Sequence, residues 1–427
     1  MFRSSFAGAA CVLLFTAALA AQTFSPNVRI GAPAGDDWEA AAAIDNVNGY
    51  LYTIYLHQND GQTLCSGCGQ HEIIQSSTNG GAAWSAPVMP APGPYGKGGQ
   101  FDPSLYVDPA TGKLYFTFMQ GIPGGAIDMV TSTDHGVTWT SPQVVSGSIT
   151  NTDKDLLAVS GQTLAVCFDD YYHVYGSVST NGGATWTVHT IQTWKNAPQQ
   201  LLCSGAGIDS QGNIYFAYNE YNKTTNTNPS TLWIYKSSNG GVAWTTIPID
   251  QGGAPYACRH CGAGAYLAPQ IAMKIGPDDT IYVLYNDTPD ATNGAPERIY
   301  FRKSTDHGAT FSARVDVSQA PTGVEHSFPM VAVGTAASDV RLAWEDRRTG
   351  SWNVYYKEST NAGATFTNEV RVSDNAEGYS YQTSTGFLFP YGDYFQMVVD
   401  AKGKTHLAWG EAPAYTSAGN IFTAAEQ

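Results

Sequence analysis

The stretch that decides the fold of this 427-residue sequence is Ser132-Thr133-Asp134-His135-Gly136-Val137-Thr138-Trp139, because five close copies of it occur elsewhere. Every copy has a Ser, an Asp or Asn two residues later, a Gly two residues after that, and a closing Trp or Phe. The six copies occupy residues 77–84, 132–139, 179–186, 237–244, 304–311 and 359–366. A motif that returns in this way after short apolar runs is typical of a repeat protein.

The spacing within the motif predicts a tight turn between two strands. The Asp134 side chain can accept hydrogen bonds from nearby backbone N–H groups, and Gly136 can adopt the positive φ that such a turn needs. Four of the six copies carry Asn in place of Asp. Because an amide cannot transfer protons, we interpret the repeated residue as structural rather than catalytic.

This pattern, S-x-D-x-G-x-T-W, resembles the Asp-box (BNR) repeat of sialidases and many other secreted β-propellers. The resemblance covers residues 77–366 and implies a propeller with these turns on one face and ligand binding on the other. The motif specifies an architecture and leaves the activity open.

The runs before and after each copy give the number of blades. We predict an all-β, seven-bladed propeller of four-stranded antiparallel blades, with six blades as the alternative if one run is a loop. The orphan run Val28–Ala32 resembles the fourth strands and is expected to close the ring on the last blade. The seven innermost strands are predicted at Trp38–Asp45, Phe101–Asp108, Asp155–Val159, Leu201–Ile208, Pro269–Ile275, Phe328–Val333 and Tyr394–Asp400.

The N-terminal segment and the net charge indicate the compartment and the class of partner of the protein. Arg3, the apolar run Ala7–Leu19 and the small residues around Ala20 predict a secretory signal peptide at residues 1–21, followed by one domain at 22–427. The mature protein is expected to be secreted or periplasmic, without a membrane span, and monomeric. The net charge of −15, with no basic cluster, argues against nucleic acid as a partner.

Six cysteines follow the signal peptide, and an even number in an exported protein favours disulfides. Cys167 and Cys203 lie on neighbouring blades and are candidates to pair. The two Cys-x-x-Cys motifs predict either local or loop-to-loop disulfides or, as the alternative, a zinc site. No cofactor is predicted. The six candidates for disulfides are Cys65, Cys68, Cys167, Cys203, Cys258 and Cys261.

Carboxylates at the start of the innermost strands are the candidate catalytic groups. Glycoside hydrolysis uses two carboxyl groups that flank the scissile bond. Adjacent blades supply Asp102 with Asp155, our first choice, and Asp393 with Glu39, our second. The alternative is that each carboxylate accepts backbone hydrogen bonds at the end of a strand.

The resemblance to sialidases implies an arginine on the innermost strand of the first blade, where this sequence reads Asp37-Trp38-Glu39-Ala40. Strict sialidase activity is therefore not expected. The candidates for substrate binding are Arg259, Arg298, Arg347, Tyr391 and Tyr394. The leading hypothesis is an exported propeller that acts on or binds carbohydrate, with glycoside hydrolysis as its more specific form. The alternative is a non-catalytic interaction or glycan-binding propeller at the cell surface.

Overall fold

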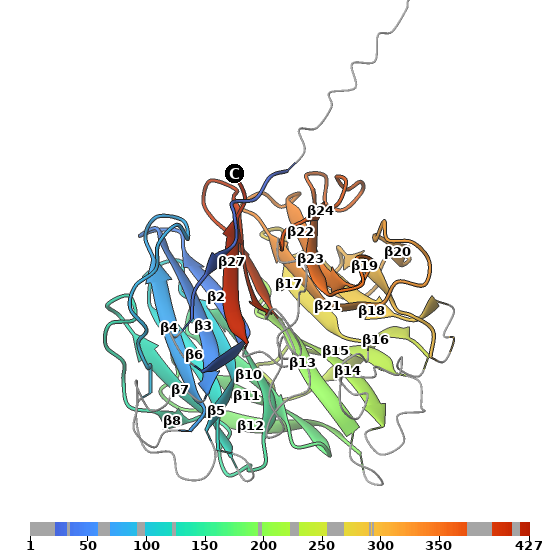
Figure 1. The fold of residues 1–427 in the computed structure, drawn as a ribbon. Helices are drawn as coiled ribbons and strands as arrows, with labels where there is room; N and C mark the ends of the chain where they lie inside the picture. The colour runs from blue at the N-terminus through green and yellow to red at the C-terminus, as the bar shows by residue number, and fades with distance from the viewer. Residues whose placement is uncertain are drawn as a thin grey trace, which may run out of the picture.

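The computed structural model describes residues 22–31, 35–58, 69–91, 99–121, 125–194, 199–222, 230–253, 269–289, 292, 294–373, 395–411 and 419–427. Within these ranges the chain forms seven antiparallel sheets arranged around a common axis, and we call the space along this axis the channel (Figure 1). Six sheets contain four strands and one contains three. The predicted seven-bladed β-propeller is confirmed, and the alternative of six blades is excluded.

Each sheet is one blade, and its strands run in chain order from the channel outward, except in blade 7, whose outermost strand is β1. Blades 1 to 3 contain β2 (Asp36–Asp45), β3 (Tyr50–Gln58) and β4 (His71–Ser77); β5 (Gln100–Val107), β6 (Leu114–Gln120), β7 (Ala126–Ser132) and β8 (Gln143–Val144); and β9 (Asp153–Ser160), β10 (Thr163–Asp169), β11 (His173–Ser179) and β12 (Thr187–Thr193). Blades 4 and 5 contain β13 (Gln199–Ile208), β14 (Ile214–Asn222), β15 (Thr231–Ser237) and β16 (Thr245–Gln251); and β17 (Ile271–Ile275), β18 (Ile281–Asp287), β19 (Arg298–Ser304) and β20 (Val315–Asp316). Blades 6 and 7 contain β21 (His326–Val333), β22 (Val340–Asp346), β23 (Asn353–Ser359) and β24 (Val370–Arg371); and β25 (Gln396–Val399), β26 (Thr405–Glu411), β27 (Asn420–Ala425) and β1 (Val28–Arg29).

The hydrophobic core lies between neighbouring blades. The second strand of a blade is covered on both sides, and every residue of β18 and β22 is buried. Phe116 and Phe118 of blade 2, for example, pack in one cluster with Ile54 of blade 1. These β-branched and aromatic residues fit a sheet that is buried on both faces.

The repeated turns form as their sequence predicts. Ser132 donates its hydroxyl to Asp134 (2.8 Å) and accepts the N–H of Gly136, whose φ is +83°. Asp134 accepts the N–H of Thr138 at 2.9 Å, and these bonds, with the Thr138 hydroxyl foremost, lower the pKa of Asp134 to about 2. Trp139 donates its indole N–H to the Gly136 carbonyl at 3.0 Å. We call the face that carries these turns the turn face and the opposite one the loop face.

The ring closes through the N-terminal strand, as predicted. β1 pairs antiparallel with β27, which places Val28 opposite Thr423 (dark blue beside red in Figure 1). Blade 1 differs from the prediction of a fourth strand in every blade. After its turn Val88 alone among the described residues bridges to Ile74, and Pro90, two residues later, has no N–H for the next bond of the ladder.

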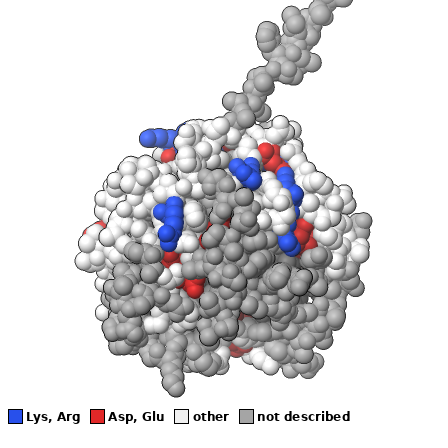
Figure 2. Space-filling model, in the orientation of Figure 1, with Lys and Arg blue, Asp and Glu red and all other residues white. Residues whose placement is uncertain are grey.

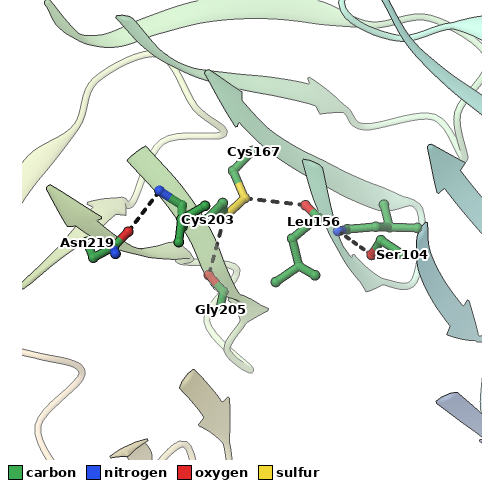
Figure 3. Close-up of a disulfide and its surroundings, with 8 residues drawn as sticks. Ser104, Leu156, Cys167, Cys203, Gly205 and Asn219 are labelled. Carbon is green, nitrogen blue, oxygen red and sulfur yellow. Dashed lines mark hydrogen bonds between the residues drawn. A yellow bond between two sulfur atoms is a disulfide. The ribbon is translucent and has the colours of Figure 1, made fainter. Parts of the chain in front are cut away.

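One disulfide joins two blades. Cys167 in β10 and Cys203 in β13 are bonded, with their Cα atoms 6.5 Å apart, at the junction of blades 3 and 4 (Figure 3). The predicted pairing of these two residues is confirmed, whereas Cys65, Cys68, Cys258 and Cys261 lie outside the described residues. Throughout the described ranges, no helix has the length and apolar character needed to cross a membrane.

Candidate functional site at the loop end of the channel

Four innermost strands carry the same β-bulge near the loop face. In each strand one extra residue lies opposite the second strand, and one residue takes a positive φ of 52° to 57°. The left-handed conformation is costly for residues other than glycine and occurs preferentially at functional positions. The four left-handed residues are Glu39, Asp102, Lys154 and Phe328.

The bulges of blades 2, 3 and 6 border a narrow cavity of about 40 Å³ at the loop end of the channel. Blades 2 and 3 contribute Asp102, Lys154 and Asp155, and the remaining polar lining comes from Ser204, Gln270 and Gln396 on blades 4, 5 and 7. The fold thus brings together Asp102 and Asp155, the two carboxylates predicted from adjacent strands. A cavity of this size holds a few water molecules.

Asp102 forms an ion pair inside this cavity. Lys154 Nζ lies 2.7 Å from Asp102 Oδ1, and the two side chains are only 9% and 3% exposed. The ammonium is held by the neighbouring blade, so the pair also joins blade 2 to blade 3. An ammonium and a carboxylate at this distance make a charge-assisted hydrogen bond.

Asp155 is the neighbouring carboxyl group and has the opposite environment. Burial, with a smaller contribution from the charge of Asp102, raises the pKa of Asp155 well above its usual value, although the Thr117 hydroxyl acts against the rise. The cavity therefore contains one carboxyl group paired with a cation and one that retains its proton at higher pH. Such a division between two carboxyl groups is characteristic of acid–base sites.

Glu72 belongs to the same cluster and was not predicted. It is fully buried at the start of β4, and burial followed by the charges of Glu39, Asp102 and Asp155 raises its pKa well above the usual value. Neither carboxyl oxygen of Glu72 has a hydrogen-bond partner among the described residues. In the sequence, Glu72 is a carboxylate inside the apolar run of a third strand. That position alone does not indicate which way the side chain points.

The two described arginine candidates differ in their contacts. Arg298 is held by Asp316, at 2.9 Å from Nε, and donates to the carbonyls of Ser318 and Ala320. Arg347 lies with its guanidinium carbon 5.8 Å from the ring centroid of Trp352. Its charge acts to lower the pKa of Glu325, which burial raises. Arg347 thus lies near the buried carboxyl group of Glu325, while Arg298 fastens a loop.

Several candidates lie outside the described residues, namely Asp393, Arg259, Tyr391 and Tyr394. The second predicted carboxylate pair is therefore represented by Glu39 alone. Across the described ranges, no group of three or more His, Cys, Asp or Glu side chains is arranged to hold a metal ion. Lys and Arg side chains form small separate groups on the face shown in Figure 2 rather than a continuous basic surface.

Comparison with known proteins gives the fold and no family. No family model and no curated protein sequence matches the chain. An ulvan lyase of polysaccharide lyase family PL25 superposes with a TM-score of 0.57 at 13% identity, over 93% of this chain and 95% of the lyase. A protein of unknown function from Dyadobacter fermentans gives 0.56 at 12%, over 96% and 100%. The Hadza microbial sialidase Hz136 gives 0.51 at 14%, over 92% of this chain and 66% of the sialidase. By this measure the chain is similar in fold to β-propellers that include carbohydrate-active enzymes.

Proposed function

We propose that this chain is an exported carbohydrate-active propeller that hydrolyses a glycosidic bond at the loop end of its channel. The observation that carries the proposal is the pair in one cavity: Asp102 beside Lys154, and Asp155 with a raised pKa. The ulvan lyase and the sialidase of similar fold support a carbohydrate as the substrate. The buried disulfide between Cys167 and Cys203 supports export, since such bonds persist in oxidising compartments.

The two carboxyl groups have complementary roles in this mechanism. The sugar ring binds on the loop face, above a cavity that is large enough only for water. Asp155 donates its proton, relayed by a water molecule of the cavity, to the glycosidic oxygen as the bond to the anomeric carbon breaks. Asp102 accepts a proton from a water molecule, whose oxygen forms the new bond to that carbon. Lys154, whose Nζ lies 2.7 Å from Asp102 Oδ1, holds in position the carboxylate that acts as the base.

The alternative is a propeller that binds glycan without catalysis. It is favoured by the completeness of the Asp102–Lys154 pair, which is also what a purely structural ion pair between two blades would show. Catalysis and binding make different predictions for the purified protein, so one assay separates them.

The test is a screen of the mature protein against neutral and acidic polysaccharides and chromogenic glycosides, sialosides included. Hydrolysis releases reducing ends without ultraviolet absorbance, whereas elimination at a uronic acid gives an absorbing unsaturated product. The proposal predicts reducing ends without that absorbance. An absorbing product would show that the reaction is elimination rather than hydrolysis. Retention of a glycan without any product would favour the binding alternative.

A further inference from the structure

A groove opens on the turn face where the ring closes. We call each interface between neighbouring blades a seam. The groove has a volume of about 440 Å³ and lies between blades 7 and 1, with Val28, Leu51, Trp84, His406 and Ala425 among its lining residues. A second hollow of about 520 Å³ adjoins it and shares Leu51, Asn79, Gly80 and His406 with it. Each lies within the 300–1,000 Å³ that is usual for sites that bind small molecules.

At this seam a small residue stands where three other seams carry a large side chain. At three seams a large side chain from the third strand of one blade approaches the turn glycine of the next: Ile74 reaches Gly136, Met129 reaches Gly183, and Phe301 reaches Gly363. The register places Thr423 at the corresponding position of blade 7. A methyl group at Gly81 would contact only Leu51 and Trp84, both of its own blade, within 4 Å.

The residue just before the turn glycine adds to this difference. In blade 2 it is His135, which stacks on Tyr50 with the ring centroids 4.1 Å apart. In blade 5 it is His307, whose Nδ1 lies 2.9 Å from Asp209 of blade 4. In blade 1 it is Gly80, as it is Gly182 in blade 3 and Gly240 in blade 4, so no side chain extends from this turn into the seam.

The lining of the groove combines an apolar wall with buried polar atoms. Trp84 and Leu51 supply the wall, against which the apolar face of a sugar ring can pack. Thr53 Oγ1 and His406 Nδ1 are buried without a hydrogen-bond partner among the described residues. Buried polar atoms without a partner are uncommon in proteins, and these two belong to residues that line the groove.

Carboxylates outnumber cations in the adjoining hollow, where Asp45 and Asp400 stand beside one lysine, Lys402. Asp400 lies 3.2 Å from His406 Nε2 and accepts the backbone N–H groups of Lys402 and Lys404. Although burial acts to raise the pKa of Asp400, these bonds keep it below its usual value. Asp45 borders the adjoining hollow and likewise has a lowered pKa, because the bonds from Asn48 and Val47 outweigh its burial. Two ionised carboxylates repel sulfated and uronic sugars and leave a neutral ligand as the suitable one.

We propose that this closure-seam groove binds a neutral sugar residue of a glycan, as a second carbohydrate site on the face opposite the channel carboxylates. It would hold a polymer on the protein independently of the chemistry at Asp102 and Asp155, so the inference does not depend on hydrolysis. The site faces away from the loop end of the channel, and the two sites can be occupied by different segments of one chain.

The test is titration of the mature protein with neutral hexasaccharides of glucose, mannose, xylose and galactose, followed by calorimetry. Two variants change the groove by different means. Thr423→Met fills the groove with a side chain like Met129, which fills another seam. Trp84→Phe makes the apolar wall of the groove smaller but keeps an aromatic residue, as two other turns do. Trp186→Phe is the matched control, because the seam at its turn is already filled by Met129.

The proposal predicts binding of at least one hexasaccharide, weakened at least tenfold by either Thr423→Met or Trp84→Phe and unchanged by Trp186→Phe and Asp102→Asn. Equal binding by all four variants, or no binding of any hexasaccharide by the parent protein, would overturn it. Loss with Asp102→Asn alone would assign the binding to the channel site instead. A variant that fails to fold is recognised by circular dichroism, and the other groove variant then decides.

Discussion

Removing Lys154 should destabilise the protein far more than removing Asp102. Lys154→Met leaves Asp102, which is 3% exposed, as a buried carboxylate without the ammonium 2.7 Å away. Breaking a buried ion pair from one side costs about 3–5 kcal/mol. Asp102→Asn leaves Lys154 close to Asp155 and Asp169, whose pKa values this cation acts to lower. Either can ionise in compensation, so we expect a loss of about 2 kcal/mol or less.

The double variant Asp102→Asn/Lys154→Met provides the decisive comparison. It buries neither charge, so it should be more stable than Lys154→Met alone, with a coupling free energy of about 2–3 kcal/mol between the two sites. The measurement is reversible unfolding in urea, with slopes compared to confirm that the unfolded states are alike. Additive losses in the double variant, or a loss below about 1 kcal/mol for Lys154→Met, would refute the reasoning.

Three further predictions concern stability. Replacing Cys167 and Cys203 together by Ala should lower the free energy of unfolding by about 4 kcal/mol, because the bond closes a sequence separation of 36 residues; an unchanged melting temperature would contradict this. Glu39, with φ at 57°, should tolerate Gly within about 1 kcal/mol but lose about 2 kcal/mol or more as Val, which thermal melts of the two variants compare directly. Burial, followed by the charge of Asp250, raises the pKa of Asp287 to about 7. A group with a raised folded-state pKa stabilises the protein at low pH and ceases to do so as the pH rises through that value. Stability should therefore fall by up to about 3 kcal/mol between about pH 5 and pH 7, and Asp287→Asn should remove that part of the fall in urea titrations at the two pH values.

The repeated turns made the architecture predictable because their spacing fixes strand, turn and strand in every blade. The ring closure followed from the likeness between Val28–Ala32 and the fourth strands. The short fourth segment of blade 1 was partly predictable, since Pro90 lacks the N–H that the next bond of the ladder would need.

The site was only partly predictable. Asp102 and Asp155 were found because the ends of innermost strands meet at the channel, a consequence of topology alone. Glu72 comes from a third strand, and its approach to the cluster depends on packing across two blades. The bulges were missed because Glu39, Lys154 and Phe328 take a backbone conformation that sequence reasoning expects only of glycine. The contacts of Arg298 depend on how residues 316–321 fold over its guanidinium, which no local pattern indicates.

The central claim is that the carboxyl groups at the loop end of the channel perform the chemistry. Its most direct test is the turnover of Asp155→Asn on the polysaccharide or glycoside that the parent protein cleaves, beside Asp128→Asn as a control. Asp128 is also a buried carboxyl group, with a pKa raised by burial to about 6, but it does not line the channel cavity. We predict that Asp155→Asn lowers kcat at least about 100-fold while Asp128→Asn leaves it unchanged. Full activity of folded Asp155→Asn would contradict the claim.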